Sequence, residues 1–81
     1  MRIMVQAPIG ERAGLAEIEI RPDHTVKQVK TKVCQSFGVN PNTVALMYGG
    51  EVLKENRSMK ALGITDGAQL ALMPLDIVGG L

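Results

Sequence analysis

The apolar residues change their spacing once along the chain, and this change constrains the fold more than any other feature. Residues 1–6 and 15–20 follow the period of two that is typical of a half-buried strand. Apolar residues then recur every three or four positions, at Val26, Val29, Val33 and Phe37. That spacing places one apolar stripe along a helix of about three turns. The sequence therefore predicts a β-hairpin followed by an amphipathic helix.

Capping residues mark both ends of this helix. Thr25 and Gln28 have the spacing of a capping box, in which each side chain bonds the other residue's backbone N–H. Gly38 stands where a left-handed C-cap is favoured, and Asn40-Pro41 does not readily continue a helix. The lysines within the helix are expected to lie mostly off the apolar stripe: Lys27, Lys30 and Lys32.

After the helix, the chain is predicted to return to the sheet as short strands. We expect these strands at residues 44–48, around residues 52–53 and at residues 68–73. Gly49-Gly50 supplies the tight turn between the first two, and Pro74 stops the last. Ser58 is expected to cap a short helical turn over residues 59–62.

This order of elements predicts an α+β fold in which one helix crosses one face of a mixed four- to five-stranded sheet. The first and last strands are mostly apolar, so we expect them to be neighbours near the centre of the sheet. That arrangement is the β-grasp topology. We expect residues 1–74 to form this domain and residues 75–81 to form a flexible C-terminal tail.

The composition excludes several functions. One cysteine and one histidine leave no disulfide and no Cys/His metal cluster, and only 2% of the residues are aromatic. Nine basic and eight acidic residues give a net charge of +1, which is too small a field to attract nucleic acid or anionic lipid. No apolar run approaches the roughly 18 residues that span a bilayer. We expect a soluble, cytoplasmic monomer without metal, cofactor, nucleic-acid or membrane partner.

No group of residues has the pattern of a catalytic site. Cys34 lacks a base at a suitable spacing and lies on or beside the apolar stripe, so we interpret it as a structural thiol. His24 is expected to be a solvated loop residue, and Glu17 and Glu19 to lie on a solvated strand face. The sequence therefore predicts that the chain is not an enzyme.

Over nearly its whole length the chain resembles ubiquitin and its archaeal relatives. An ordered set of short motifs carries the resemblance: residues 1–5, 25–26, 29–33, 38–41, 46–48, Gly50, Leu53, 58–59, 62–64, 70–73 and 79–80. Residues 29–34 are most similar to the archaeal ubiquitin-like modifiers. The resemblance implies a ubiquitin-like protein modifier with a β-grasp fold.

Gly79-Gly80 carries the functional prediction. Glycine has no Cβ, so its backbone can pass through narrow active sites. The resemblance implies that the carboxylate of Gly80 is activated and joined to lysines of target proteins through an isopeptide bond, with Gly79 as a slender spacer. Leu81 ties up that carboxylate, so we expect a precursor that is cleaved between Gly80 and Leu81. The alternative is that Leu81 is tolerated or is a remnant.

The resemblance also implies partners: an E1-like activating enzyme, an E2-like conjugating enzyme, an E3 ligase, a processing metalloprotease or deubiquitinase, and the target proteins. Where eukaryotic ubiquitins carry arginines, the tail has Asp76, Ile77 and Val78, which favours a cognate apparatus over the eukaryotic one. Two other functions stay open. One is a sulfur carrier with a C-terminal thiocarboxylate, against which Leu81 argues mildly, and the other is an interaction domain that is never conjugated.

A docking patch is implied on the sheet face opposite the helix. It consists of Met47 and Met73, with Pro8 or Ile9 as a third member, and the alternative is that the methionines fill the core. The candidate acceptor lysines for a second modifier are Lys27, Lys30, Lys32, Lys54 and Lys60. Two positions that commonly build ubiquitin chains carry Glu51 and Asp66, which favours single modification.

Overall fold

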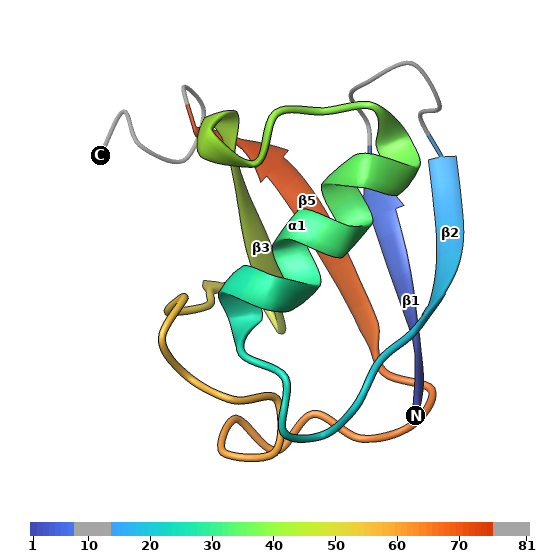
Figure 1. Cartoon of the computed structure of the whole chain (residues 1–81), viewed down its shortest axis with the longest axis vertical. Helices are drawn as coiled ribbons and strands as arrows, with labels where there is room; N and C mark the ends of the chain where they lie inside the picture. The colour runs from blue at the N-terminus through green and yellow to red at the C-terminus, as the bar shows by residue number, and fades with distance from the viewer. Residues whose placement is uncertain (8–13, 76–81) are drawn as a thin grey trace.

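The computed structural model describes residues 1–7 and 14–75, which form a five-stranded sheet with a helix laid across one face (Figure 1). The strands are β1 (Arg2–Ala7), β2 (Gly14–Glu19), β3 (Val44–Tyr48), β4 (Glu51–Val52) and β5 (Gln69–Pro74). The helices are α1 (Val26–Phe37) and the short 3-10 helix η1 (Pro41–Thr43). All of these except η1 were predicted from the sequence.

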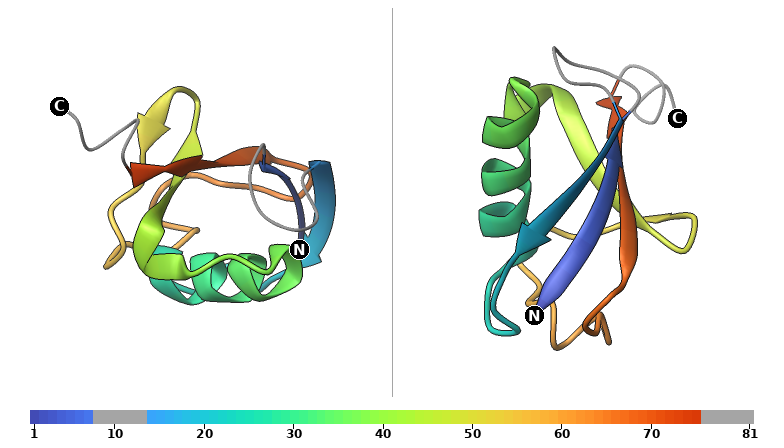
Figure 2. Two further views of the ribbon diagram at one scale, coloured as in Figure 1. Left: turned by 90° about the horizontal axis from the view of Figure 1, so that it is seen from above. Right: turned by 90° about the vertical axis from the view of Figure 1, so that its right-hand side faces the viewer.

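The strand order is β2-β1-β5-β3-β4, so the first and last strands lie side by side in the middle of the sheet. β1 and β5 run parallel, whereas the pairs β1–β2, β3–β5 and β3–β4 are antiparallel. The predicted mixed sheet and β-grasp topology are confirmed. Figure 2 shows that α1 covers one face of this sheet and that no other described element covers the opposite face.

Helix α1 begins and ends as its capping residues predict. The backbone N–H of Gln28 donates to Thr25 Oγ1 at 3.3 Å, and the backbone N–H of Thr25 donates to Gln28 Oε1 at 2.9 Å. Gly38 closes the helix in the left-handed conformation, with φ 71°. The apolar stripe faces the sheet and is buried, together with the thiol of Cys34: Val26, Val29, Val33, Cys34 and Phe37.

Lys27 and Lys32 lie off the stripe and are exposed, as expected, but for Lys30 the expectation is wrong, because it lies on the buried face of the helix. Only 7% of this residue is exposed. Lysine can occupy such a position when its methylene stem packs against apolar neighbours and its ammonium finds hydrogen-bond acceptors. Here the acceptors come from β3 and from the loop after β4.

The expected helical turn after Ser58 forms as a series of turns rather than as a helix. The hydroxyl of Ser58 accepts a hydrogen bond from the backbone N–H of Ala61 at 3.1 Å, as the cap requires. The carbonyl of Ser58 accepts from Leu62 N–H at 3.2 Å, and Gly63 ends the segment with φ 73°. Met59 anchors it, because its side chain is fully buried in the core.

Candidate functional site

Met47 and Met73 lie on the sheet face that α1 leaves open. Strand residues alternate between the two faces, and the buried neighbours Leu46 and Leu72 point toward the helix. Met47 and Met73 therefore point away from it, and both are half-buried. Neither belongs to the core cluster, so the alternative that these methionines fill the core is wrong.

A shallow hollow of about 290 Å³ lies between the two methionines, and we call it the outer hollow. The pairing of β5 with its two neighbours brings the sides of the hollow together, because Ala71 pairs with Met47 on β3 and with Gln6 on β1. The hollow is lined by Gln6, Met47, Gly49, Gly50, Gln69, Leu70, Ala71 and Met73. None of these residues is charged, so the hollow suits weak, apolar contacts. Methionine side chains also adapt readily to different partners.

Two expected members of the docking patch, Pro8 and Ile9, lie outside the described residues, and so do Gly79, Gly80 and Leu81. The described residues end at Leu75, one residue after β5, and the segment that carries Gly80 continues from this point.

The charged groups of the open face gather beside β2, away from the outer hollow. Arg2 forms ion pairs with Glu17 at 3.2 Å and with Glu19 at 3.6 Å. The side chains of both glutamates are at least half exposed, at 51% and 69%. This agrees with the predicted solvated face, and exposed pairs of this kind contribute little to stability.

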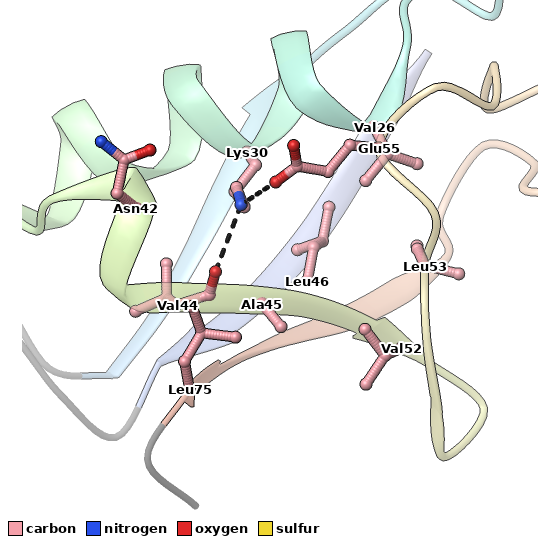
Figure 3. A pocket seen from close by; sticks show the side chains of 10 residues that line it. All are labelled: Val26, Lys30, Asn42, Val44, Ala45, Leu46, Val52, Leu53, Glu55 and Leu75. Carbon is pink, nitrogen blue, oxygen red and sulfur yellow. Dashed lines mark hydrogen bonds and ion pairs between the residues drawn. The ribbon is translucent and has the colours of Figure 1, made fainter. Parts of the chain in front are cut away.

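Lys30 forms a buried polar link between α1 and the β3–β4 side of the sheet (Figure 3). Its Nζ donates to the carbonyl oxygen of Val44 at 3.2 Å and pairs with the carboxylate of Glu55. The hydrogen bond and the charge of Lys30 hold the pKa of Glu55 below its usual value. Lys30 was expected to be a candidate acceptor, but this engaged and buried ammonium is the least accessible of the five lysines considered.

The other candidate lysines are exposed. Lys32 Nζ donates to the carbonyl oxygen of Glu19 at 2.5 Å. Lys27, Lys54 and Lys60 form no side-chain ion pair with any residue that the structure describes. On accessibility alone, these three are better placed than Lys30 to accept a modifier.

Cys34 and His24 both occupy structural positions. Cys34 is completely buried, and burial raises the pKa of its thiol although the nearby charge of Lys30 lowers it in part. His24 Nδ1 accepts a hydrogen bond from the backbone N–H of Arg21 at 3.2 Å, inside the turn before α1. Within residues 1–7 and 14–75, no three His, Cys, Asp or Glu side chains gather as metal ligands would.

Sequence reasoning did not single out Glu55, Val52 or Leu75. Glu55 follows its partner Lys30 by 25 residues, so no local spacing could have revealed the pair. The side chains of Val52 and Leu75 are large, apolar and exposed.

Among the described residues, no helix has both the length and the apolar character needed to cross a membrane.

The ubiquitin family profile matches residues 12–74 of the chain. Among solved structures, the ubiquitin of Caldiarchaeum subterraneum superposes with a TM-score of 0.82 and 34% sequence identity, and the match covers 91% of each chain.

Two relatives illustrate the range of proteins with similar sequences. The ubiquitin-like protein NEDD8-like protein 2 of Dictyostelium discoideum is 30% identical over 57 residues, which are 68% of this chain and 71% of that protein. The UV excision repair protein RAD23 of Saccharomyces cerevisiae is 30% identical over 56 residues, but the match spans only 14% of its length. The matches to two further long relatives span 7% and 16% of the lengths of those proteins.

Proposed function

Because the chain belongs to the ubiquitin family, we propose that it is a protein modifier that is conjugated through Gly80 to lysines of target proteins. The observation that carries this proposal is the Gly79-Gly80 pair, whose second glycine follows the end of β5 at Pro74 by six residues. Glycines at this distance from the domain give a partner enzyme room to reach the backbone on all sides.

The proposed chemistry takes place on an E1-like and an E2-like partner enzyme, and the chain is the group transferred. An E1-like enzyme lets the Gly80 carboxylate attack the α-phosphorus of ATP, which forms an acyl adenylate and releases pyrophosphate. A cysteine thiolate of that enzyme then displaces AMP to form a thioester, which passes to an E2-like enzyme. With or without an E3 ligase, the neutral amine of a target lysine attacks the thioester, the thiolate leaves, and an isopeptide bond remains.

Leu81 requires a step before activation. While Gly80 is joined to Leu81, its carbonyl is an amide and offers no carboxylate to ATP. We propose that a metalloprotease or another deubiquitinase hydrolyses this peptide bond with one water molecule and so frees the carboxylate of Gly80. The processed chain acts in the cytoplasm, where its single thiol stays reduced.

We propose the outer hollow as the docking patch through which partners bind the modifier. Met47 and Met73 are half-buried and face away from the helix, and no charged residue lines the hollow between them. Burying a half-exposed methionine supports only modest binding, at most about 1.5–3 kcal/mol each. Contacts made through this patch would therefore be transient, as a modifier that passes between enzymes requires.

A second function has its own support. The long relatives, RAD23 among them, match this chain over a small part of their length. This is what a ubiquitin-like domain within a larger protein would give, and such a domain would bind partners through the outer hollow without being conjugated. It would need no free carboxylate at Gly80.

One experiment separates these functions. The chain ending at Gly80 is incubated with ATP, the activating enzyme encoded in the same genome and an extract of the same cells, which supplies conjugating enzymes, target amines and a sulfur donor. The products are resolved on a non-reducing gel and by mass spectrometry. A thioester that dithiothreitol cleaves and that passes to protein amines supports the modifier. A thiocarboxylate on Gly80 would identify a sulfur carrier, and no activation would identify an interaction domain. The matched control is the chain ending at Gly79.

A further inference from the structure

A second hollow, of about 210 Å³, lies at the edge of the sheet, and we call it the edge hollow (Figure 3). Strand β3 forms its floor, α1 and the loop after β4 form its sides, and Leu75, directly after β5, closes it. Its apolar lining comes from Val26, Val44, Ala45, Leu46, Val52, Leu53 and Leu75, and its polar lining from Lys30, Asn42 and Glu55.

Two exposed apolar side chains flank this hollow. Val52 is 47% exposed and Leu75 is 38% exposed, although both are large and apolar. Among the described residues only one other large apolar side chain is as exposed, Leu15 at 56%. Leu15 lies on β2, at the opposite end of the sheet from β4. Exposed apolar surface is therefore concentrated beside the edge hollow.

The charged groups of the edge hollow neutralise each other. The ammonium of Lys30 is bound to the carboxylate of Glu55 and to the carbonyl of Val44. No buried side-chain nitrogen or oxygen in residues 1–7 and 14–75 lacks a hydrogen-bond partner. A charged side chain placed here would lose its hydration without gaining a free counter-charge. The hollow therefore favours an apolar occupant.

The position of Leu75 favours one partner for this surface, the enzyme that acts on Gly80. Gly80 follows Leu75 by five residues, and five extended residues reach at most about 17 Å. A protein interface of standard size covers about 800 Å² on each partner, which corresponds to a disc of about 16 Å radius. The edge hollow therefore lies within reach of an enzyme that holds Gly80 in its active site through such an interface.

We propose that the edge hollow binds an apolar side chain of the enzyme that adenylates Gly80, with Val52 and Leu75 closing around that side chain. This inference rests on the proposed function, because it requires that Gly80 is activated. It adds a second contact surface to the outer hollow, on the edge of the sheet from which the tail departs. It also means that the enzyme recognises the base of the tail through apolar contact rather than through charge.

The test measures ATP–pyrophosphate exchange by the activating enzyme encoded in the same genome, with the chain ending at Gly80 as the varied substrate. Val52→Lys and Leu75→Lys should each raise KM by about tenfold or more and leave kcat unchanged. Val52→Ile keeps the apolar contact and should behave like the parent chain. The matched control is Leu15→Lys, which puts the same charge on a somewhat more exposed apolar position at the far edge of the sheet. It should change KM by less than about twofold.

Circular dichroism and thermal unfolding verify that each variant is folded. If Val52→Lys and Leu75→Lys have the KM of Leu15→Lys while the parent chain is activated normally, the inference is overturned and the proposed function stands. An equal rise in KM in all three lysine variants also overturns the inference, because the effect would then not depend on the edge hollow. If the parent chain itself supports no exchange, the proposed function fails and the inference fails with it.

Discussion

The carboxylate of Asp66 accepts a hydrogen bond from the backbone N–H of Arg2 at 2.7 Å, across 64 residues of chain. The next residue, Gly67, donates its backbone N–H to the carbonyl of Arg2, also at 2.7 Å. The two bonds tie the beginning of β1 to the turn that leads into β5, its parallel neighbour. The resemblance to ubiquitin places a chain-building lysine at this position, but here Asp66 caps the central strand pair.

We expect Asp66→Ala to lower the free energy of unfolding by about 1 kcal/mol, because one exposed, charge-assisted hydrogen bond is lost. In a domain of this size, that corresponds to a fall of about 4–8 °C in Tm. Asp66→Asn keeps the accepting oxygen and should stay close to the parent. Thermal unfolding followed by circular dichroism measures both, and equal Tm values for Asp66→Ala and the parent chain would contradict this role.

The lysines should differ in reactivity in the order of their accessibility. With a limiting amount of an acetylating succinimidyl ester, we expect Lys54 and Lys60 to react first and Lys30 at least about tenfold more slowly. Lys30 has to break its contacts with Glu55 and Val44 before its amine is exposed. Mass spectrometry of peptides from a short time course measures the rates. Equal rates for Lys30 and Lys54 would show that the buried link does not persist in solution.

The ion pair also predicts how stability depends on pH. Lys30 lowers the pKa of Glu55 in the folded chain below its ordinary value of 4.5. The stabilising contribution of Glu55 is therefore fully present above that value and is lost as the pH falls through the lowered pKa. Because the carboxylate is half exposed, we expect the ion pair to contribute only about 0.5 kcal/mol to the free energy of unfolding.

The measurement compares urea unfolding of the parent chain and of Glu55→Gln at pH 7 and at successively lower pH. The parent should be more stable at pH 7, and the difference should vanish in acid. Glu51→Gln, at an exposed glutamate without an ion pair among the described residues, is the control and should be as stable as the parent at pH 7. A difference that stays constant down to acid pH would rule out this pairing as its cause.

Cys34 should be unreactive until the chain unfolds. Its side chain is fully buried, so a reagent cannot reach the sulfur. Burial also raises the pKa of the thiol, so little of the reactive thiolate forms near neutral pH. We expect Ellman's reagent to modify the native chain more than about a hundredfold more slowly than the chain in concentrated urea. Stoichiometric modification of the native chain at the unfolded rate would instead identify an accessible thiol.

How far the sequence predicts this structure depends on how local each determinant is. Helix α1 was predicted with its caps because Thr25, Gln28 and Gly38 lie within the helix or beside it. The face of Met47 and Met73 followed from strand alternation and from the family resemblance. The burial of Lys30 was missed because its partners, Val44 and Glu55, lie 14 and 25 residues away and only the fold brings them to it. The edge hollow was missed for the same reason, since Val52 and Leu75 come to line one hollow only through the pairing of β4 and β5 with β3.

The most direct test of the proposed function looks for the conjugate itself. The chain ending at Gly80 is incubated with ATP, the activating and conjugating enzymes of its own genome and a protein extract, and the products are digested with trypsin. Because residues 61–80 contain no lysine or arginine, trypsin leaves this whole segment attached to each modified lysine. We expect target peptides in which a lysine amine is joined to the carbonyl of Gly80, and none with the chain ending at Gly79. A chain recovered only as a thiocarboxylate, or unmodified with no such peptides, would contradict the account.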